Sequence, residues 1–232
     1  MIHQLIFAAP KPGMTVEEFQ DYWVKVHAVR FASKIPQIKK YLIDTTIPFD
    51  LGGGDPKWSG VAEIWLNNEE EQLASLQTEE FLQGARLDEP KWAAFWQTVV
   101  LDTDAHELKA GPALVEGQEW VKLIVLVKRK EGLPLAAFRE YSLGSHGELT
   151  LKVPGLRRYL QGHTRDGAYG IGEPVLDAAY QLWFDDVAAL EAALASPEFK
   201  QVVEDYPEFV EPRYVHRLVT TEHWVIGPDA RP

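Results

Sequence analysis

Hydrophobic and polar positions follow one pattern that occurs twice along the chain. Each occurrence opens with a short apolar run, residues 5–9 and 123–127, which is typical of a strand covered on both faces. Apolar residues at helical spacing come next. Thr15 and Glu18 predict a capping box for the first of these helices, and Pro134 suits the first turn of the second.

The remaining elements come in the same order in both halves. The first helices are expected to end before Pro36 and Pro154, because a residue that precedes proline avoids the helical region. The second helices are expected to begin after Asn68, where three glutamates follow, and near Asp185 and Asp186, since acidic side chains favour a helix N-terminus. Further strands are predicted at 38–44, 61–66 and 98–106, and at 156–163, 178–184 and 213–225. The predicted order is therefore βαββαβ, twice.

Individual residues recur as well as the pattern. At a shift of 119 positions, Phe19, Tyr22 and His27 match Phe138, Tyr141 and His146, and two single-residue slips extend the match towards the C-terminus. Recurrence in the same order indicates a gene duplication. We expect one unit at 1–108, a second at 119–226, and a Gly- and Pro-containing connector at 109–118. Helices on one face of each sheet leave an apolar face bare, and two copies can bury these faces against each other.

Composition excludes several classes of function. The chain has 232 residues, with 23 Lys and Arg against 35 Asp and Glu, a net charge of −12. So acidic a surface disfavours nucleic-acid and membrane partners. There is no cysteine, which removes thiolate chemistry and disulfides and fits a reducing cytosol. The N-terminal residues do not have the pattern of a secretion signal, so a cytoplasmic location is expected.

The repeated motif resembles the EthD-like proteins. An early Gly precedes Phe19, Tyr22, Trp23 and His27, an Ala-Glu-Ile-Trp-Leu strand follows, and Asp88 stands four residues before an aromatic residue. The resemblance implies an α+β fold of tandem ferredoxin-like repeats, whose antiparallel sheets pack as an intramolecular dimeric α+β barrel. It also implies a small-molecule enzyme, since relatives include isomerases, cyclases, dehydratases, cofactor-free monooxygenases and some haem enzymes. Other relatives have no known activity.

His27 is the leading candidate for catalysis, because imidazole exchanges protons near neutral pH. Tyr22 lies five residues earlier, about 140° away around an α-helix. Glu63 interrupts an apolar strand, where burial would raise the pKa of a carboxyl group and provide an acid. The hypothesis is that His27, Tyr22 and Glu63 are catalytic. Residues expected to bind substrate are Trp23, Arg30, Trp65, Tyr141 and His146. Repeat 1 is expected to be the active one, because Ser142, Leu149 and Gln181 replace Trp23, Arg30 and Glu63 in repeat 2.

Structural roles remain open for the same residues. Both histidines could simply hold a helix to the sheet, Glu63 could pair with a basic or hydroxyl group, and Asp88 and Asp205 could cap short helices. The other five histidines lack a carboxylate at a useful spacing. No metal-binding motif occurs, so no metal is expected, although a single axial His would suffice for haem.

The sequence therefore favours a small-molecule enzyme that uses side-chain acid/base chemistry on a hydrophobic or aromatic carbonyl substrate, without a cofactor. A non-enzymatic binding or interaction module and a haem-dependent oxidoreductase are the alternatives. A homodimer formed through the helix faces remains open.

Overall fold

The computed structural model describes residues 1–52, 54–113, 119–170 and 172–231. Residues 114–118 of the expected connector lie outside them. The first repeat contains β1 (Ile2–Ala8), α1 (Val16–Tyr22), α2 (Ala28–Arg30), β2 (Lys40–Thr46), β3 (Gly60–Leu66), α3 (Glu69–Ser75), α4 (Arg86–Asp88) and β4 (Val99–Lys109). The second contains β5 (Val121–Val127), α5 (Leu135–Tyr141), α6 (Gly147–Thr150), β6 (Arg158–Thr164), α7 (Asp166–Tyr169), β7 (Ala178–Phe184), α8 (Val187–Leu194), α9 (Pro197–Phe209) and β8 (His216–Ile226).

The helices begin where their capping residues predict. The Thr15 hydroxyl accepts a hydrogen bond from the Glu18 N–H while the Glu18 carboxylate accepts one from the Thr15 N–H, which confirms the capping box. Asn68 and Asp186 likewise cap α3 and α8. Pro134 is itself the N-cap residue of α5, one position before the first turn. The βαββαβ order predicted for each repeat is confirmed.

The chain forms two compact units, and the two repeats exchange their last strands between these units. The described residues of the first unit are 1–52, 54–102 and 220–231, and those of the second are 103–113, 119–170 and 172–219. In the first unit β8 pairs with β2, with Asp44 opposite Glu222. In the second, β4 pairs with β6, with Thr103 opposite Thr164. Each repeat therefore contributes its last strand to the sheet of the other.

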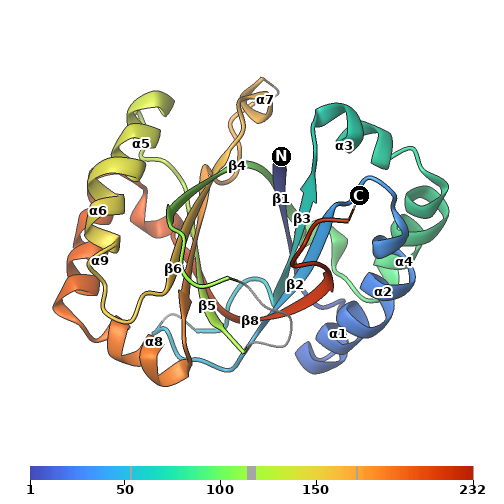
Figure 1. Ribbon diagram of the computed structural model, residues 1–232, viewed down its shortest axis with the longest axis horizontal. Helices are drawn as coiled ribbons and strands as arrows, with labels where there is room; N and C mark the ends of the chain where they lie inside the picture. Colours follow the sequence, from blue (N-terminus) through green and yellow to red (C-terminus); the bar gives the residue numbers. More distant parts are fainter. Residues whose placement is uncertain (53, 114–118, 171, 232) are drawn as a thin grey trace. The chain divides into compact units, whose positions relative to one another are not determined.

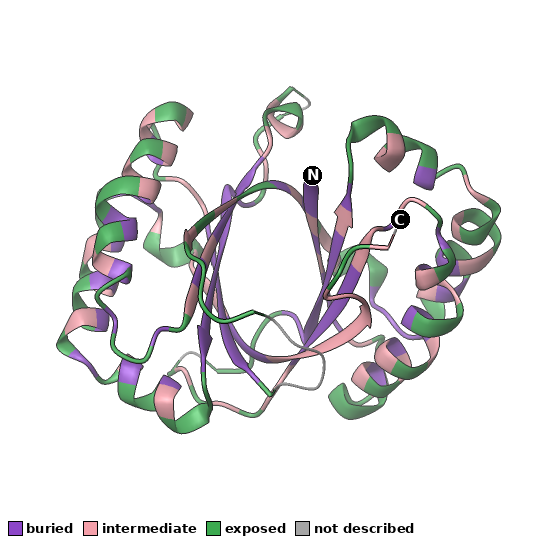
Figure 2. Cartoon of the chain, in the orientation of Figure 1, coloured by how far each residue is buried: buried purple, intermediate pink, exposed green. Residues whose placement is uncertain are grey.

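All pairings within the two units are antiparallel, and the hydrogen-bonded order of strands is β1-β3-β2-β8 in the first unit and β5-β7-β6-β4 in the second. In the first unit α1, α2 and α4 lie along one face of the β1–β3–β2 sheet, and in the second α5, α6 and α9 lie along one face of the β5–β7–β6 sheet (Figure 1). The strands are mostly buried and the outer helix faces are exposed (Figure 2). This arrangement confirms the predicted α+β class of tandem ferredoxin-like repeats.

Aromatic side chains fill the space between helices and sheet in the first unit. Trp23 is 2% exposed and packs against Phe19 and Trp92, with ring centroids 5.3 and 4.9 Å away. A Cβ atom at Gly60 would lie 2.9 Å from the Trp23 ring, so glycine is what allows the indole to reach the strand. Trp23 therefore belongs to the core of this unit.

None of the helices in the described ranges combines the length and apolar character that a membrane span requires.

The exchange of strands leads to a prediction about the separated repeats. Residues 1–110 expressed alone would lack β8, which leaves the edge of β2 unpaired and exposes apolar sheet surface. We expect this half to dimerise, with β4 of one copy taking the place of β8 in the other, or to aggregate. Light scattering measures this, and a well-behaved monomer would contradict it.

Candidate functional site

A carboxylate joins Tyr22 and His27 in the first repeat. Asp88, on α4, accepts hydrogen bonds from the Tyr22 hydroxyl at 2.9 Å and from Nδ1 of His27 at 2.9 Å. Lys91 also donates to Asp88, at 3.0 Å. Asp88 is 1% exposed and His27 is 5% exposed. The half-buried Tyr22 and the buried Asp88 and His27 therefore form one cluster, which we call the repeat-1 triad.

The second repeat contains the same cluster. Asp205, on α9, accepts from the Tyr141 hydroxyl at 2.7 Å and from Nδ1 of His146 at 2.9 Å. Here Glu208 occupies the position that corresponds to Lys91, so the carboxylate lacks the third donor. We call Tyr141, Asp205 and His146 the repeat-2 triad.

The helices carrying both triads contain a π-helical turn, at Trp23–His27 in repeat 1 and at Ser142–His146 in repeat 2. In the first, the Ala28 N–H bonds the Trp23 carbonyl five residues back. Wider turns bring residues five apart closer in angle than an α-helix does. Tyr22 and His27 can therefore reach one carboxylate, which the α-helical separation of about 140° did not lead us to expect.

The hydrogen bonds set the ionisation of each group in repeat 1. Burial acts to raise the pKa of Asp88, but donation from His27, Lys91 and Tyr22 outweighs it and the pKa is lowered. Burial also lowers the pKa of His27, against the opposing effect of Asp88, so the ring is neutral at neutral pH. The pKa of Tyr22 is raised, by burial and by its bond to Asp88, so its hydroxyl stays a donor.

These charge states fix the tautomer of the imidazole. An ionised carboxylate can only accept, so Nδ1 of His27 carries the proton and Nε2 presents a lone pair. In repeat 2, burial acts to raise the pKa of Asp205, but the bonds from His146 and Tyr141 outweigh it and the pKa is lowered, so this carboxylate also accepts from Nδ1 of its histidine. The Asp205 hydrogen bond, followed by burial, raises the pKa of Tyr141 to about 12. Each triad can thus offer an oriented general base.

Glu63 lies on the other face of the sheet from the repeat-1 triad. Its neighbours Ala62 and Ile64 belong to the core beneath the helices, so strand alternation directs Glu63 to the opposite face of the sheet. There Oε2 lies 2.6 Å from Nε2 of His3, which is 1% exposed. The expectation that Glu63 assists His27 is therefore wrong in its geometry, and so is the statement that His3 lacks a carboxylate partner.

Two other predicted residues form no part of the triads. Trp65 stacks on His3 at 4.5 Å and on Trp224 at 5.9 Å, on the Glu63 face. Arg30 is exposed at the end of α2 and makes a weak electrostatic contribution at Tyr22. Of the predicted site, the structure brings together Tyr22 with His27 and Tyr141 with His146.

The two carboxylates were missed as site residues. The sequence suggests helix caps for both, whereas in the structure each carboxylate accepts hydrogen bonds from a Tyr hydroxyl and a His ring. A signal was present: both recur one turn before an aromatic residue, about 60 positions after the matched histidine. Within the described residues, no three His, Asp or Glu side chains gather as a metal site would require.

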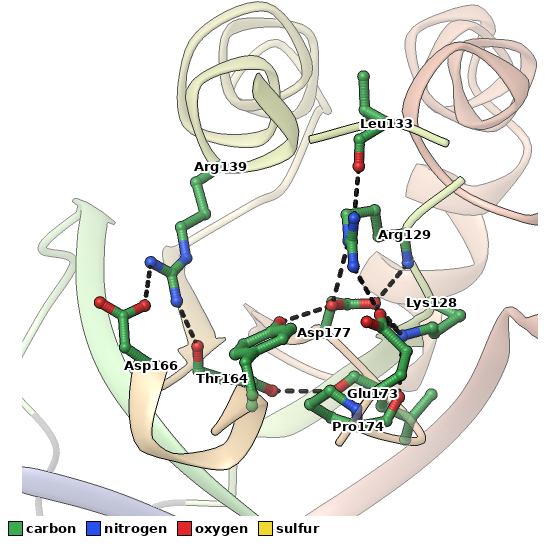
Figure 3. Close-up of polar contacts among 11 residues, drawn as sticks. Lys128, Arg129, Leu133, Arg139, Thr164, Asp166, Glu173, Pro174 and Asp177 are labelled. Atoms are coloured by element: carbon green, nitrogen blue, oxygen red, sulfur yellow. Dashed lines mark hydrogen bonds and ion pairs between the residues drawn. The ribbon is translucent and has the colours of Figure 1, made fainter. Parts of the chain in front are cut away.

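A further cluster fixes the helix of the repeat-2 triad to its sheet. Arg139, on α5, donates to the Thr164 carbonyl and to Asp166, both at 2.7 Å (Figure 3). Next to it, the buried Asp177 accepts from the Arg129 N–H at 2.8 Å and pairs with Lys128 at 2.9 Å. In repeat 1, the amide of Gln20 joins helix to sheet in a similar way, because it donates to the carbonyls of Thr46 and Ser59 at 2.9 Å.

Comparison with known families accounts for the duplicated motif. The family model described as EthD domain matches residues 11–95 and again 130–213. The chain belongs to the EthD family. Both matches contain one Tyr–Asp–His triad, so the site lies inside the family domain each time. Among curated protein sequences, no match to this EthD protein is found.

Solved structures share the two-repeat fold over its whole length. An anthrone oxidase-like protein is 12% identical, with a TM-score of 0.63 over 100% of this chain and 95% of that one. A proposed monooxygenase of Fusobacterium nucleatum subsp. nucleatum ATCC 25586 is 10% identical, with a TM-score of 0.59 over 99% and 95%. Another proposed monooxygenase, from Lactobacillus acidophilus NCFM, is 14% identical, with a TM-score of 0.53 over 99% of this chain and 97% of that one. At these identities the likeness concerns the fold alone.

Proposed function

We propose that this EthD protein is a small-molecule enzyme that moves protons on a hydrophobic, carbonyl-bearing substrate. The observation that carries the proposal is the carboxylate-oriented imidazole of each triad, in which Asp88 or Asp205 holds Nδ1 and leaves Nε2 to the substrate. Such a carboxylate fixes the tautomer and stabilises the imidazolium that forms when the base accepts a proton.

Proton abstraction next to a carbonyl is the step that isomerases, cyclases, dehydratases and cofactor-free oxygenases have in common. The names of the structural neighbours, an anthrone oxidase-like protein and proposed monooxygenases, agree with chemistry of this kind. Aromatic side chains around both imidazoles suit an apolar substrate: Trp92 lies 4.7 Å from His27, and Phe209 lies 4.7 Å from His146.

The test uses 2-tetralone, a small aromatic ketone with acidic α-protons. In D₂O, NMR follows the loss of the α-proton signal as deuterium enters. We expect the full chain to accelerate this exchange above the buffer rate, and the double variant His27→Gln, His146→Gln to lose the acceleration. Equal rates for the chain and the double variant would contradict the proposal.

A structural module is the second candidate, and one observation favours it. In repeat 1 the hydrogen bonds of Asp88 tie Tyr22 at the end of α1, and His27 in the turn that follows, to α4, which lies 66 and 61 residues further along the chain. In that case the double variant would be less stable than the unaltered chain, and neither protein would exchange 2-tetralone protons faster than buffer does. Thermal melts together with the exchange assay separate the two functions.

Haem does not fit either histidine. Trp92 and Phe31 pack around His27, at 4.7 and 6.3 Å, and Tyr180, Tyr206 and Phe209 pack around His146, at 5.5, 5.5 and 4.7 Å. These rings occupy space beside each imidazole that a porphyrin would need.

We therefore predict that the purified chain binds no stoichiometric haem. A visible spectrum recorded with and without added haem should show no intense, saturable absorption band. Co-purification of one haem per chain, lost on His27→Ala or His146→Ala, would show the prediction to be wrong.

A further inference from the structure

Buried polar side chains stand in repeat 2 where repeat 1 has an apolar core. Trp23, Ile43 and Ala62 of the repeat-1 core correspond to Ser142, Gln161 and Tyr180, all at most 1% exposed. The strand register confirms the correspondence, since Ile43 faces Ala62 across β2 and β3 as Gln161 faces Tyr180 across β6 and β7. Repeat 1 shows that this fold needs no polar groups here, and their burial is unfavourable unless they are hydrogen-bonded.

The direction of each hydrogen bond in the repeat-2 network follows from its partners. The Gln161 amide Nε2 donates to the Ser142 carbonyl at 2.8 Å, which fixes the amide orientation. The Gln161 Oε1 then accepts from the Ser142 hydroxyl at 2.8 Å and from Nε2 of His163 at 2.9 Å. The Tyr180 hydroxyl donates to Ser142 Oγ at 2.6 Å.

One nitrogen of this network is left over. Because an amide oxygen only accepts, Nε2 of His163 must carry a proton, and burial keeps the ring neutral by lowering its pKa to about 3. Nδ1 of His163 is then a bare acceptor. The side chain is 2% exposed, and this nitrogen has no hydrogen-bond partner among the residues that the structure describes. Buried acceptors without a partner are rare and unfavourable.

Aromatic rings surround the same imidazole. The ring centroid of His106 lies 5.0 Å away and that of Phe138 lies 5.9 Å away. Tyr180, bonded to the network through Ser142, lies 5.5 Å from His146 of the repeat-2 triad. The bare acceptor and the candidate base therefore belong to one helix–sheet interface.

We propose that the helix–sheet interface of repeat 2 binds a small hydroxyl-bearing aromatic molecule, whose O–H donates to Nδ1 of His163. The proposal rests on the proposed function, because it treats this molecule as a carbonyl substrate that also bears a hydroxyl group and is presented to His146. It assigns repeat 2, with its polar network, to substrate recognition. A buried water could satisfy the same nitrogen, and the experiment distinguishes the two.

The experiment compares two probes that differ only in the donor, 2-naphthol and 2-methoxynaphthalene, by calorimetric titration of the full chain. We expect saturable binding of 2-naphthol, about tenfold tighter than that of 2-methoxynaphthalene, because the ether cannot donate. The variant His163→Phe keeps a ring and removes the acceptor, so it should abolish the preference. Thr45→Val alters the repeat-1 counterpart of His163 and should leave the preference unchanged.

Three results would overturn the proposal: no saturable binding, equal affinity for the two probes in the unaltered chain, or a preference that survives His163→Phe. The comparison of probes needs no variant, so a His163→Phe chain that fails to fold does not weaken the test. Because binding is measured without turnover, a failure here is distinct from failure of the 2-tetralone exchange assay.

Discussion

Replacing Asp205, in the repeat to which we assign substrate recognition, with asparagine is expected to slow the exchange of 2-tetralone α-protons by about 10²- to 10⁴-fold, the usual contribution of a positioned proton-transfer group. The carboxylate oxygen 2.9 Å from Nδ1 of His146 becomes part of a neutral amide. An amide cannot stabilise the imidazolium as a carboxylate does, and its NH₂ group favours the tautomer with the proton on Nε2, which removes the base. The side-chain volume is nearly unchanged, so NMR exchange rates can be compared on a folded protein.

Two matched variants make this result specific. Asp88→Asn makes the same change in the repeat-1 triad, where the sequence placed the catalytic histidine. Asp21→Asn removes an exposed carboxylate that, among the described residues, pairs only with Lys25, and exchange should be unaffected. A large loss in Asp88→Asn alone would assign catalysis to repeat 1 and contradict our assignment of substrate recognition to repeat 2. Unaltered exchange in both triad variants would remove the triads from the mechanism.

Local chemistry made most of the fold predictable. The caps at Thr15, Asn68 and Asp186 fix where helices begin, and apolar runs bounded by turns fix the strands to within a few residues. Gly13 and Gly132 recur because both adopt a positive φ, 88° and 79°, which suits glycine. The exchange of β4 and β8 was not predictable, because a strand's own pattern says which face is buried and not which edge it joins.

The site was predictable only where the spacing was local. Tyr22 and His27 stand out within one helix, but Asp88 lies 61 residues beyond His27, and a π-helical turn changes the angle on which an α-helical estimate depends. Glu63 was correctly expected to need a partner. Strand alternation, however, places it with His3 on the face away from His27.

The polar network of repeat 2 has no counterpart at the same positions of repeat 1. Neither Gln161 nor His163 was singled out from the sequence, because one polar residue in a strand is commonly a solvent-facing position. In repeat 1, Ile43 and Thr45 occupy the positions of Gln161 and His163, and the core next to them is apolar. The polar residues are therefore a property of repeat 2 and not of the fold, which is what directs attention to a ligand.

Lowering the pH from 7 to 5 is expected to reduce the free energy of unfolding by about 2 kcal/mol through His163 alone. Burial is the main reason that the pKa of His163 falls from 6.5 to about 3, His106 and Arg139 add to it, and Asp177 opposes it. Below pH 6.5 the unfolded chain protonates this ring, while the folded protein keeps it neutral until about pH 3. The unfolded state then binds more protons, so stability is present above pH 6.5 and is lost as the pH falls through this window.

Denaturant unfolding at pH 7 and pH 5 measures the effect by comparison with His163→Phe. That variant loses the hydrogen bond to Gln161, so its stability at a single pH is not informative. The decrease in its free energy of unfolding from pH 7 to pH 5, however, should be about 2 kcal/mol smaller than that of the unaltered chain. His27 and His223, whose pKa values burial also lowers, are present in both proteins and their contributions cancel. The same loss of stability in both proteins would mean that the His163 ring is already protonated or solvated in the folded state. A bare Nδ1 acceptor could then not be the group that a bound hydroxyl recognises.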